Sequence, residues 1–155
     1  DYIASCYDSL TEIPGRGGLF RIFGESNIKA IAMIDIDFFK KVNDTFGHEM
    51  GDAAIKGMGV VLQEVIGKDK VIGRLGGDEF GIVAPGMIIE HVPLIRKKID
   101  ETCKKESKRL KLPYTLSVSV GYASLEKSSL LKQLMSEADE MLYKEKRKKH
   151  GRKKS

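Results

Sequence analysis

The spacing of apolar and polar residues predicts four strands. Residues 29–37 form a short apolar run that ends in acids, which is typical of a buried strand. Residues 70–84 predict a hairpin of two strands, because Gly76-Gly77 separates two apolar runs. Residues 114–125 alternate strictly in their middle, which indicates a strand with one wetter face.

Four other segments carry apolar residues three or four positions apart, the spacing of an amphipathic helix. They are 38–47, 49–67, 88–110 and 129–149. The order is therefore strand, helix, helix, hairpin, helix, strand, helix, and the hairpin makes part of the sheet antiparallel. One sheet with helices packed on it, an α+β fold, is the economical architecture.

Composition is that of one globular domain over residues 1–155, with 41% hydrophobic residues. No apolar run approaches the roughly 20 residues of a membrane helix, and no signal peptide is expected. Cys6 and Cys103 are far apart in sequence, which fits a reducing compartment and gives no zinc or redox motif.

The net charge of +5 is concentrated at the C-terminal end. Residues 144–154 hold eight Lys or Arg and one Glu, so the rest of the chain is slightly acidic. This basic end is either a solvated helix end or a surface that binds phosphate or a polyanion. A stacking platform for nucleic acid is not expected, because no aromatic residue interleaves with the lysines.

Acidic residues stand at two points that a sheet could bring together. Asp35 and Asp37 are two apart at a strand end and so share a face, and Asp78 and Glu79 follow the hairpin turn. Converging carboxylates repel one another unless a cation lies between them, and oxygen ligands suit Mg²⁺. Alternatively, the first pair merely ends a strand and the second is solvated. The two glycines before Asp78 fit both readings, because they permit positive φ and leave the backbone open to a ligand.

Several blocks of the sequence match one family. Residues 76–80 read Gly-Gly-Asp-Glu-Phe, and residues 35–44 read Asp-Ile-Asp-Phe-Phe-Lys-Lys-Val-Asn-Asp. Further matches are Asp-Ser-Leu-Thr at 8–11, Gly-His-Glu-Met-Gly-Asp at 47–52 and the helical stretch 137–146. In order and spacing these blocks resemble the GGDEF-domain diguanylate cyclases over almost the whole chain.

The resemblance implies a mostly antiparallel five-stranded sheet surrounded by helices, similar to the ferredoxin-like palm of nucleotide cyclases and polymerases. It implies condensation of two GTP into cyclic di-GMP, with release of pyrophosphate, between two domains that meet as a transient or regulated homodimer. We further expect an excised catalytic domain, a sensor domain upstream, a cytoplasmic location, and no contact with nucleic acid or membrane. The alternative is a catalytically silent module that binds GTP and signals through a partner.

The resemblance also implies a metal site. Asp35, Asp78 and the backbone carbonyl of Ile36 match ligands of Mg²⁺, for which Mn²⁺ can substitute. Two such ions can stabilise both the attacking and the leaving oxygen of an in-line displacement. Asp78 is the candidate acceptor of the 3′-OH proton, with Glu79 as its neighbour in the site.

Nucleotide-binding residues follow from the same match. Asn43 and Asp52 match the guanine-reading pair; an ionised carboxylate can accept hydrogen bonds from guanine N1–H and N2–H₂, whereas adenine offers an acceptor at N1. His48 is expected to be a hydrogen-bonded structural residue. Phe38, Phe39 and Lys40 match the turn that meets the β- and γ-phosphates, with core packing as the alternative for the two Phe side chains, and Lys146 matches the family's phosphate-binding lysine. The bare backbone of Gly76 and Gly77 is expected to admit the nucleotide.

The chain departs from the family in three places. In the opening block the family's Gly, Asn, Arg and Phe are replaced by Glu12, Gly15, Gly17 and Leu19. The product-inhibition motif Arg-x-x-Asp would fall on 67–70, which read Gly-Lys-Asp-Lys, so binding of cyclic di-GMP there is not expected. After Lys146 the family places Gly-Arg at the third and fourth positions, and here Gly151-Arg152 comes two residues later.

Overall fold

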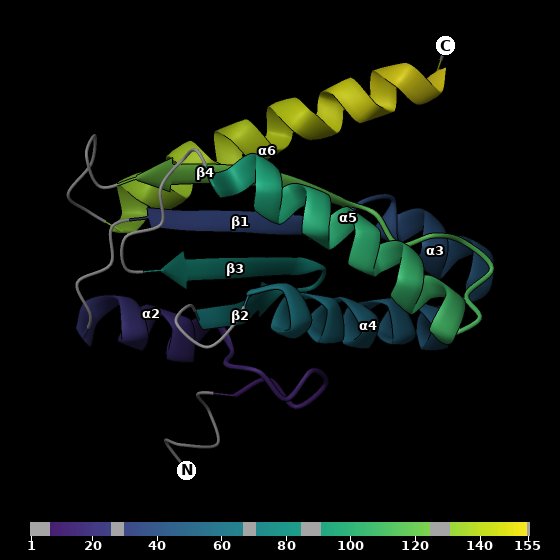
Figure 1. The fold of residues 1–155 in the computed structure, drawn as a ribbon, viewed down its shortest axis with the longest axis horizontal. Helices are drawn as coiled ribbons and strands as arrows, with labels where there is room; N and C mark the ends of the chain where they lie inside the picture. Colours follow the sequence, from purple (N-terminus) through teal and green to yellow (C-terminus); the bar gives the residue numbers. More distant parts are fainter. Residues whose placement is uncertain (1–6, 26–29, 67–70, 85–90, 125–130, 155) are drawn as a thin grey trace.

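A computed structural model describes residues 7–25, 30–66, 71–84, 91–124 and 131–154. It is an α+β fold in which helices pack on a four-stranded sheet (Figure 1). The elements in chain order are α2 (Arg16–Glu25), β1 (Ala30–Ile36), α3 (Phe39–Phe46), α4 (His48–Ile66), β2 (Val71–Gly76), β3 (Glu79–Ala84), α5 (Val92–Arg109), β4 (Val118–Ser124) and α6 (Leu131–Lys154).

β1 is the central strand of the sheet. The strand order is β2-β3-β1-β4, and every neighbouring pair is antiparallel. Ile34 and Ile36 point to one face, into a core shared with α4 and α5. Ile31 and Met33 point to the other face, where they pack with Leu142 of α6. Because both faces are covered, β1 reads as a continuous apolar run up to its acids.

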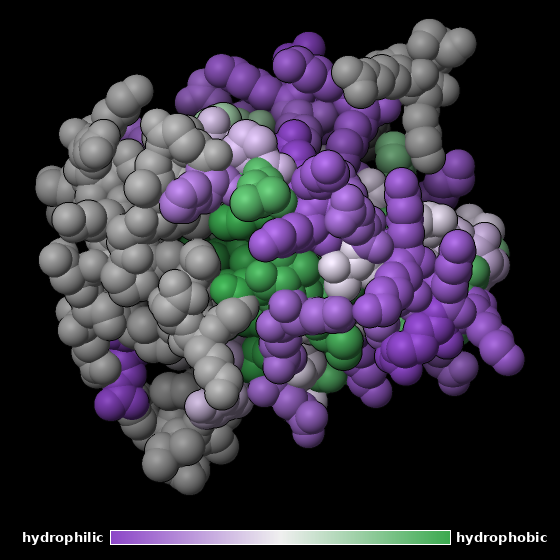
Figure 2. All heavy atoms as spheres, viewed as in Figure 1, coloured by the Kyte–Doolittle hydropathy of each residue, from purple (hydrophilic) through white to green (hydrophobic). Residues whose placement is uncertain are grey.

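Most of the described surface in the view of Figure 1 is hydrophilic, with one hydrophobic area near the middle (Figure 2). α6 runs beyond the sheet, so its basic C-terminal end projects from the body of the domain (Figure 1). None of the described helices combines the length and the apolar character needed to cross a membrane.

The predicted element order is confirmed, but the five-stranded sheet is wrong for the part of the chain that the structure describes. The outer edge of β4, where another strand could pair, is taken by side chains of α6. The ammonium group of Lys149 donates to the Val118 carbonyl, and Glu145 Oε2 accepts from the Val120 N–H at 2.5 Å. Edge groups satisfied in this way offer no ladder to a fifth strand.

The hairpin turn lies one residue later than predicted. β2 continues through Gly76, which pairs with Glu79, so the two loop residues are Gly77 and Asp78. A register shift between Arg74 and Gly76 accommodates the extra residue. Gly76 and Gly77 have φ of 155° and 43°, conformations that glycine adopts without strain. Asp78 is therefore held in the turn itself.

The sequence analysis missed α2, because Gly17-Gly18 are poor helix formers at its start. Leu19, which holds the family's Phe position, is fully buried in this helix. It packs over two glycines of the sheet: a Cβ at Gly81 would lie 2.8 Å from Leu19 Cδ2, and one at Gly73 would lie 3.1 Å from Leu19 Cβ. The departure at Leu19 is thus accommodated by a close helix–sheet contact.

The opening block forms a tight turn in spite of its departures. The Asp8 N–H donates to the Ile13 carbonyl at 2.8 Å, and the Glu12 N–H donates to the Asp8 carbonyl at 2.8 Å. Asp8 Oδ2 also accepts from the Thr11 N–H and hydroxyl at 2.9 and 2.6 Å. Glu12 has a φ of 61°, so a glutamate occupies the backbone conformation that suits the family's glycine.

We predict that Glu12→Gly stabilises the domain by about 1 kcal/mol. The left-handed conformation costs a non-glycine residue about 1–2 kcal/mol, and glycine removes that cost. Part of the gain is offset because glycine loses more conformational entropy on folding. Urea unfolding measures the effect. As a control, Glu101→Gly inside α5 should destabilise by about 1 kcal/mol. Equal losses from both substitutions would contradict the strain at Glu12.

Candidate functional site

The end of β1 brings two of the predicted acids together. Asp35 lies opposite Glu79 in the ladder between β1 and β3, and the Ile36 N–H donates to the Asp78 carbonyl at 3.2 Å. Asp35 is buried, and burial together with the adjacent carboxyl of Asp78 raises the pKa of Asp35 to about 8, against the opposing effect of Lys146. The sequence-predicted convergence of strand and hairpin acids is present at Asp35 and Asp78.

The Asp35 carboxylate is only half satisfied. Its Oδ2 lies 2.5 Å from Lys146 Nζ, whereas its Oδ1 is buried without a hydrogen-bond partner. Within the described ranges no three His, Cys, Asp or Glu side chains cluster as a metal site. The predicted ligand set needs only two carboxylates and the Ile36 carbonyl, because Mg²⁺ keeps waters and takes substrate phosphate. The unpartnered oxygen beside a second carboxyl therefore fits a divalent cation.

Asp37 shares the face of Asp35 but is fully satisfied. It accepts hydrogen bonds of 2.6 Å each from the hydroxyls of Ser117 and Ser119 and from Lys149 Nζ. Burial alone would raise the pKa of Asp37, but these donors hold it below its usual value. Asp37 is consequently a poor metal ligand, since its oxygens are already in use.

Glu79 is half-buried on the same face, between the sheet and the helices α2 and α6. Burial and the nearby carboxylates of Asp139 and Asp78 raise the pKa of Glu79, while Lys146 and Arg16 oppose the rise. Acidic groups thus gather around the end of β1, and Lys146 lies close to two of them.

The predicted base readers lie on two packed helices. Asn43 of α3 has a buried Oδ1 without a hydrogen-bond partner, and it lies directly against Gly51 of α4. A Cβ at Gly51 would be 1.8 Å from that oxygen. Asp52, the next residue, is exposed. The structure places both residues at the junction of α3 and α4, where the Asp52 side chain is exposed and the Asn43 amide oxygen is covered by α4.

The residues predicted for phosphate binding surround the start of α3 and the hairpin turn. Phe38 precedes α3 with a φ of 58°, no side chain caps the helix, and Phe38 and Phe39 are half-buried. Lys40 is exposed. A Cβ added at Gly76 or Gly77 would meet no atom within 4 Å, so the turn backbone is open. Lys146, in contrast, is paired with Asp35 and not directed to open surface. The shifted Arg152 and the segment 67–70 are not among the described side chains and residues.

Sequence reasoning gave no role to Arg74, which fixes the hairpin turn. Its Nη1 donates to Asp8 Oδ1 at 3.0 Å, and its Nε and Nη2 donate to the Gly77 carbonyl at 3.1 and 2.9 Å. Burial opposes the charge of Asp8, yet hydrogen bonds from Thr11 and the charge of Arg74 hold the pKa of Asp8 below its usual value. The available signal was an Arg two residues before a glycine pair and an Asp in the opening block.

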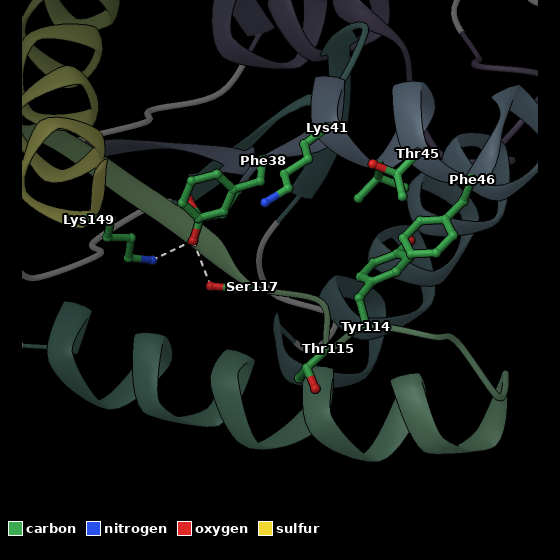
Figure 3. A pocket seen from close by; sticks show the side chains of 10 residues that line it. Phe38, Lys41, Thr45, Phe46, Tyr114, Thr115, Ser117 and Lys149 are labelled. Carbon is green, nitrogen blue, oxygen red and sulfur yellow. Dashed lines mark hydrogen bonds and ion pairs between the residues drawn. The ribbon is translucent and has the colours of Figure 1, made fainter. Parts of the chain in front are cut away.

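A cavity of about 500 Å³ adjoins the site but does not contain it. Figure 3 shows Phe38, Lys41 and Lys149 on one side and the stacked rings of Phe46 and Tyr114 on the other. The ring centroids of this stack are 5.7 Å apart. Phe38 is the one predicted nucleotide-binding residue among those that line this cavity, and no predicted metal ligand or base reader lines it, so its size does not mark it as the nucleotide site.

Known proteins provide an independent comparison. The family model described as diguanylate cyclase, GGDEF domain, matches residues 5–152 of the chain. The chain belongs to this family. The resemblance of the five sequence blocks is thereby confirmed, together with the α+β architecture of GGDEF domains.

Relatives and solved structures agree with this assignment. The chain is 31% identical over 152 residues to the probable diguanylate cyclase DgcF of Escherichia coli strain K12, covering 91% of this chain and 48% of the relative. It is 38% identical over 122 residues to the probable diguanylate cyclase DgcC of the same strain, covering 76% and 32%. The chain thus spans half or less of the length of these relatives.

Among solved structures, the coiled coil and GGDEF domain of DgcB from Caulobacter crescentus, in complex with c-di-GMP, superposes with a TM-score of 0.76 at 26% identity, covering 93% of this chain and 82% of that one. The diguanylate cyclase SiaD from Pseudomonas aeruginosa, in complex with its activator SiaC, superposes with a TM-score of 0.80 at 25% identity, covering 95% and 61%.

The raised pKa of Asp35 predicts how stability changes with pH. Without divalent metal, the folded protein holds this proton more tightly than the unfolded chain. The stabilisation of the folded state by this bound proton is therefore complete below pH 3.8, the ordinary pKa of the group, and is lost as the pH rises to about 8. Each unit of pKa difference corresponds to about 1.4 kcal/mol, so urea unfolding can detect the loss. Asp35→Asn should flatten this decline, and an unchanged slope would contradict the assignment.

The contact between Asn43 and Gly51 yields a second prediction. Gly→Ala in a helix normally stabilises by about 0.5–1 kcal/mol, and Gly17→Ala should do so because no atom lies within 4 Å of the added Cβ. Gly51→Ala should fall short of that gain by about 1 kcal/mol, because Asn43 must move. The side-chain amide signal of Asn43 in NMR spectra should shift only in Gly51→Ala. Identical behaviour of the two variants would contradict the contact.

Proposed function

We propose that the domain is a diguanylate cyclase that converts two GTP into cyclic di-GMP and two pyrophosphates. The observation that carries the proposal is the buried Asp35 carboxylate, which faces Asp78 with one oxygen unpartnered. Family membership supplies the reaction class, and this half-satisfied pair supplies a place for it. The site would operate in the cytoplasm, where GTP is available.

Asp35, Asp78 and the Ile36 carbonyl would hold Mg²⁺, or Mn²⁺ in its place. The bound metal would supply positive charge for the phosphate oxygens and lower the pKa of the attacking hydroxyl. Asp78, in the exposed hairpin turn, would accept the proton of the 3′-OH. Arg74 would keep that turn in place through the Gly77 carbonyl. Glu79 would place a third carboxyl beside the pair, and its raised pKa reflects its burial and the crowding of acids there.

The guanine base would bind where α3 meets α4. The exposed Asp52 carboxylate is an acceptor, and the Asn43 amide oxygen would become a second one on turning away from Gly51, while the Watson–Crick edge of guanine presents two adjacent donors. Adenine presents an acceptor at N1 in the same place. Two acceptors at this junction therefore support selection of GTP over ATP.

The triphosphate would lie between the start of α3 and α6. A helix start without a side-chain cap leaves backbone N–H groups that suit anions, and Phe38, Phe39 and Lys40 form that start. The open backbone at Gly76-Gly77 would let the nucleotide approach the turn. Lys146 would contribute a positive charge from α6.

The reaction would need two copies of the domain, since one copy provides one site. In each half-reaction the 3′-oxygen of one GTP forms a bond to the α-phosphorus of the other, and the bond to pyrophosphate breaks. Holding two reactants in this geometry can account for about 7–11 kcal/mol of the barrier. Relatives two to three times as long leave room for a sensor domain that would control this encounter.

A silent GTP-binding module is the second candidate. The observation in its favour is that Lys146 already occupies one oxygen of Asp35, so a cation of the protein stands where a metal is needed. The altered opening block no longer favours it, because Glu12 and Leu19 retain a packed turn and helix.

Incubation with GTP and Mg²⁺, followed by chromatography, tests the proposal. We expect cyclic di-GMP, formed at a rate that rises with the square of enzyme concentration at low concentration. Asp78→Asn should abolish product while GTP binding persists, and Asp100→Asn on the exposed side of α5 should act as the wild type. A strictly linear concentration dependence would refute the two-copy reaction. Binding of GTP without product would identify the silent module.

A further inference from the structure

Two lysines of α6 pair with two acids at the end of β1, in the same order along both elements. Lys146 Nζ lies 2.5 Å from Asp35 Oδ2, and Lys149 Nζ lies 2.6 Å from Asp37 Oδ2. Acids two apart on a strand share a face and are about 7 Å apart. Lysines three apart on a helix share a face, with a rise of about 4.5 Å, and long side chains bridge the difference. The two ion pairs therefore fix one register of the helix on the strand.

The second pair is the more constrained of the two. The Asp37 side chain is 4% exposed and is held by two serine hydroxyls besides Lys149. Lys149 also donates to the Val118 carbonyl of β4. In Figure 3 dashed lines run from Lys149 and from Ser117 to one shared oxygen. The hydrogen bonds of both side chains identify that acceptor as Asp37 Oδ2. A lysine with two buried acceptors has little freedom, so this contact is the stronger determinant of register.

The first pair has no such support. Lys146 contacts a carboxylate whose other oxygen is unpartnered. The position of Lys146 over the end of β1 depends on where α6 lies. Glu145 anchors the helix to β4 just before Lys146, and Lys149 adds a second anchor one turn further on.

Lys149 stands at a position where this chain departs from its family. It is the third residue after Lys146, where the family pattern has the Gly of a Gly-Arg pair. A glycine at this position would offer no side chain to Asp37, whereas Lys149 pairs with it.

We propose that Lys149 is a positioning residue that locks α6 onto β1 through Asp37 and so holds Lys146 at the phosphate side of the site, in place of the family's Gly-Arg pair. The inference rests on the proposed GTP binding at Asp35 and Asp78. It assigns no ligand contact to Lys149 itself, because its ammonium group already donates to the Asp37 carboxylate and the Val118 carbonyl.

Substitution of Lys149 is expected to leave the domain folded. Glu145 still joins α6 to β4 and α5, through the Val120 N–H and through Arg96 Nη2 at 2.5 Å. The apolar contacts of Ala138 and Leu142 also remain. Substitution of Lys149 therefore affects only the register in which the end of α6 lies on β1.

The test compares binding of a non-hydrolysable GTP analogue with binding of GMP, each with Mg²⁺, by calorimetry. Lys149→Met should weaken the analogue about tenfold, which is the usual result of losing one charge-assisted contact, and should leave GMP unchanged. Lys149→Arg should restore the preference for the analogue, because a guanidinium can still reach Asp37. Lys148→Met, an exposed neighbour on the same helix, and Arg152→Met should both resemble the wild type.

A double-substitution cycle shows whether Lys149 acts through Lys146. Once Lys146→Met has removed the proposed phosphate contact, adding Lys149→Met should cause no further loss. Additive losses would mean that Lys149 touches the ligand directly, and an unchanged affinity in Lys149→Met would mean that register does not matter; either result overturns the proposal. Equal weakening of GMP and the analogue would indicate a general structural defect and would also overturn it.

These outcomes are distinct from failure of the proposed function. A wild-type protein that binds the analogue no better than GMP would refute phosphate recognition at this site, whatever the variants do. Should Lys149→Met fail to fold, Asp37→Asn provides the same test from the strand side. It removes the charge that holds Lys149, while the amide oxygen can still accept from one serine hydroxyl and the amide nitrogen can donate to the other.

Discussion

Two carboxylates at the end of one central strand are the constraint to which the neighbouring elements respond. A buried charge is unfavourable unless partners replace the water that it has lost. Asp37 is hydrogen-bonded by Ser119 of β4, by Ser117 just before β4, and by Lys149 of α6, and it therefore belongs to the framework of the fold. Asp35 obtains one lysine and a second carboxyl, which leaves it unsatisfied and chemically available. The division between framework and site thus falls between two residues that are two positions apart.

The pattern of apolar and polar positions was sufficient to predict four strands and four of the helices, because buried strands read as apolar runs, a half-exposed strand alternates, and each helix buries one face. It could also predict the meeting of Asp35 with Asp78, since a hairpin beside the first strand brings the acids of both to one end of the sheet. It could not predict α2, whose glycines disguise a helix that is held by the burial of Leu19. The exact position of the turn could not be predicted either, because the register shift between Arg74 and Gly76 leaves no trace in the pattern of apolar and polar residues.

In the opening block the side chains differ from the family pattern, but the backbone keeps the conformation that the pattern requires. Glu12 keeps a left-handed conformation without being glycine, and Leu19 fills the space over Gly73 and Gly81. Arg74 then joins this block to the hairpin through Asp8 and the Gly77 carbonyl. A reader of the sequence sees substitutions here, whereas the structure shows one hydrogen-bonded path from the opening block to the turn that carries Asp78.

The side chains along the outer edge of β4 have a consequence for how copies of the domain meet. Lys149 and Glu145 occupy a carbonyl and an N–H of that edge, and at the opposite edge of the sheet the Arg74 N–H donates to the Pro14 carbonyl at 2.8 Å. At these groups the sheet offers no free donor or acceptor to a strand from another molecule. A strand that paired at either edge would first have to break these hydrogen bonds, which disfavours edge-to-edge association of the sheet.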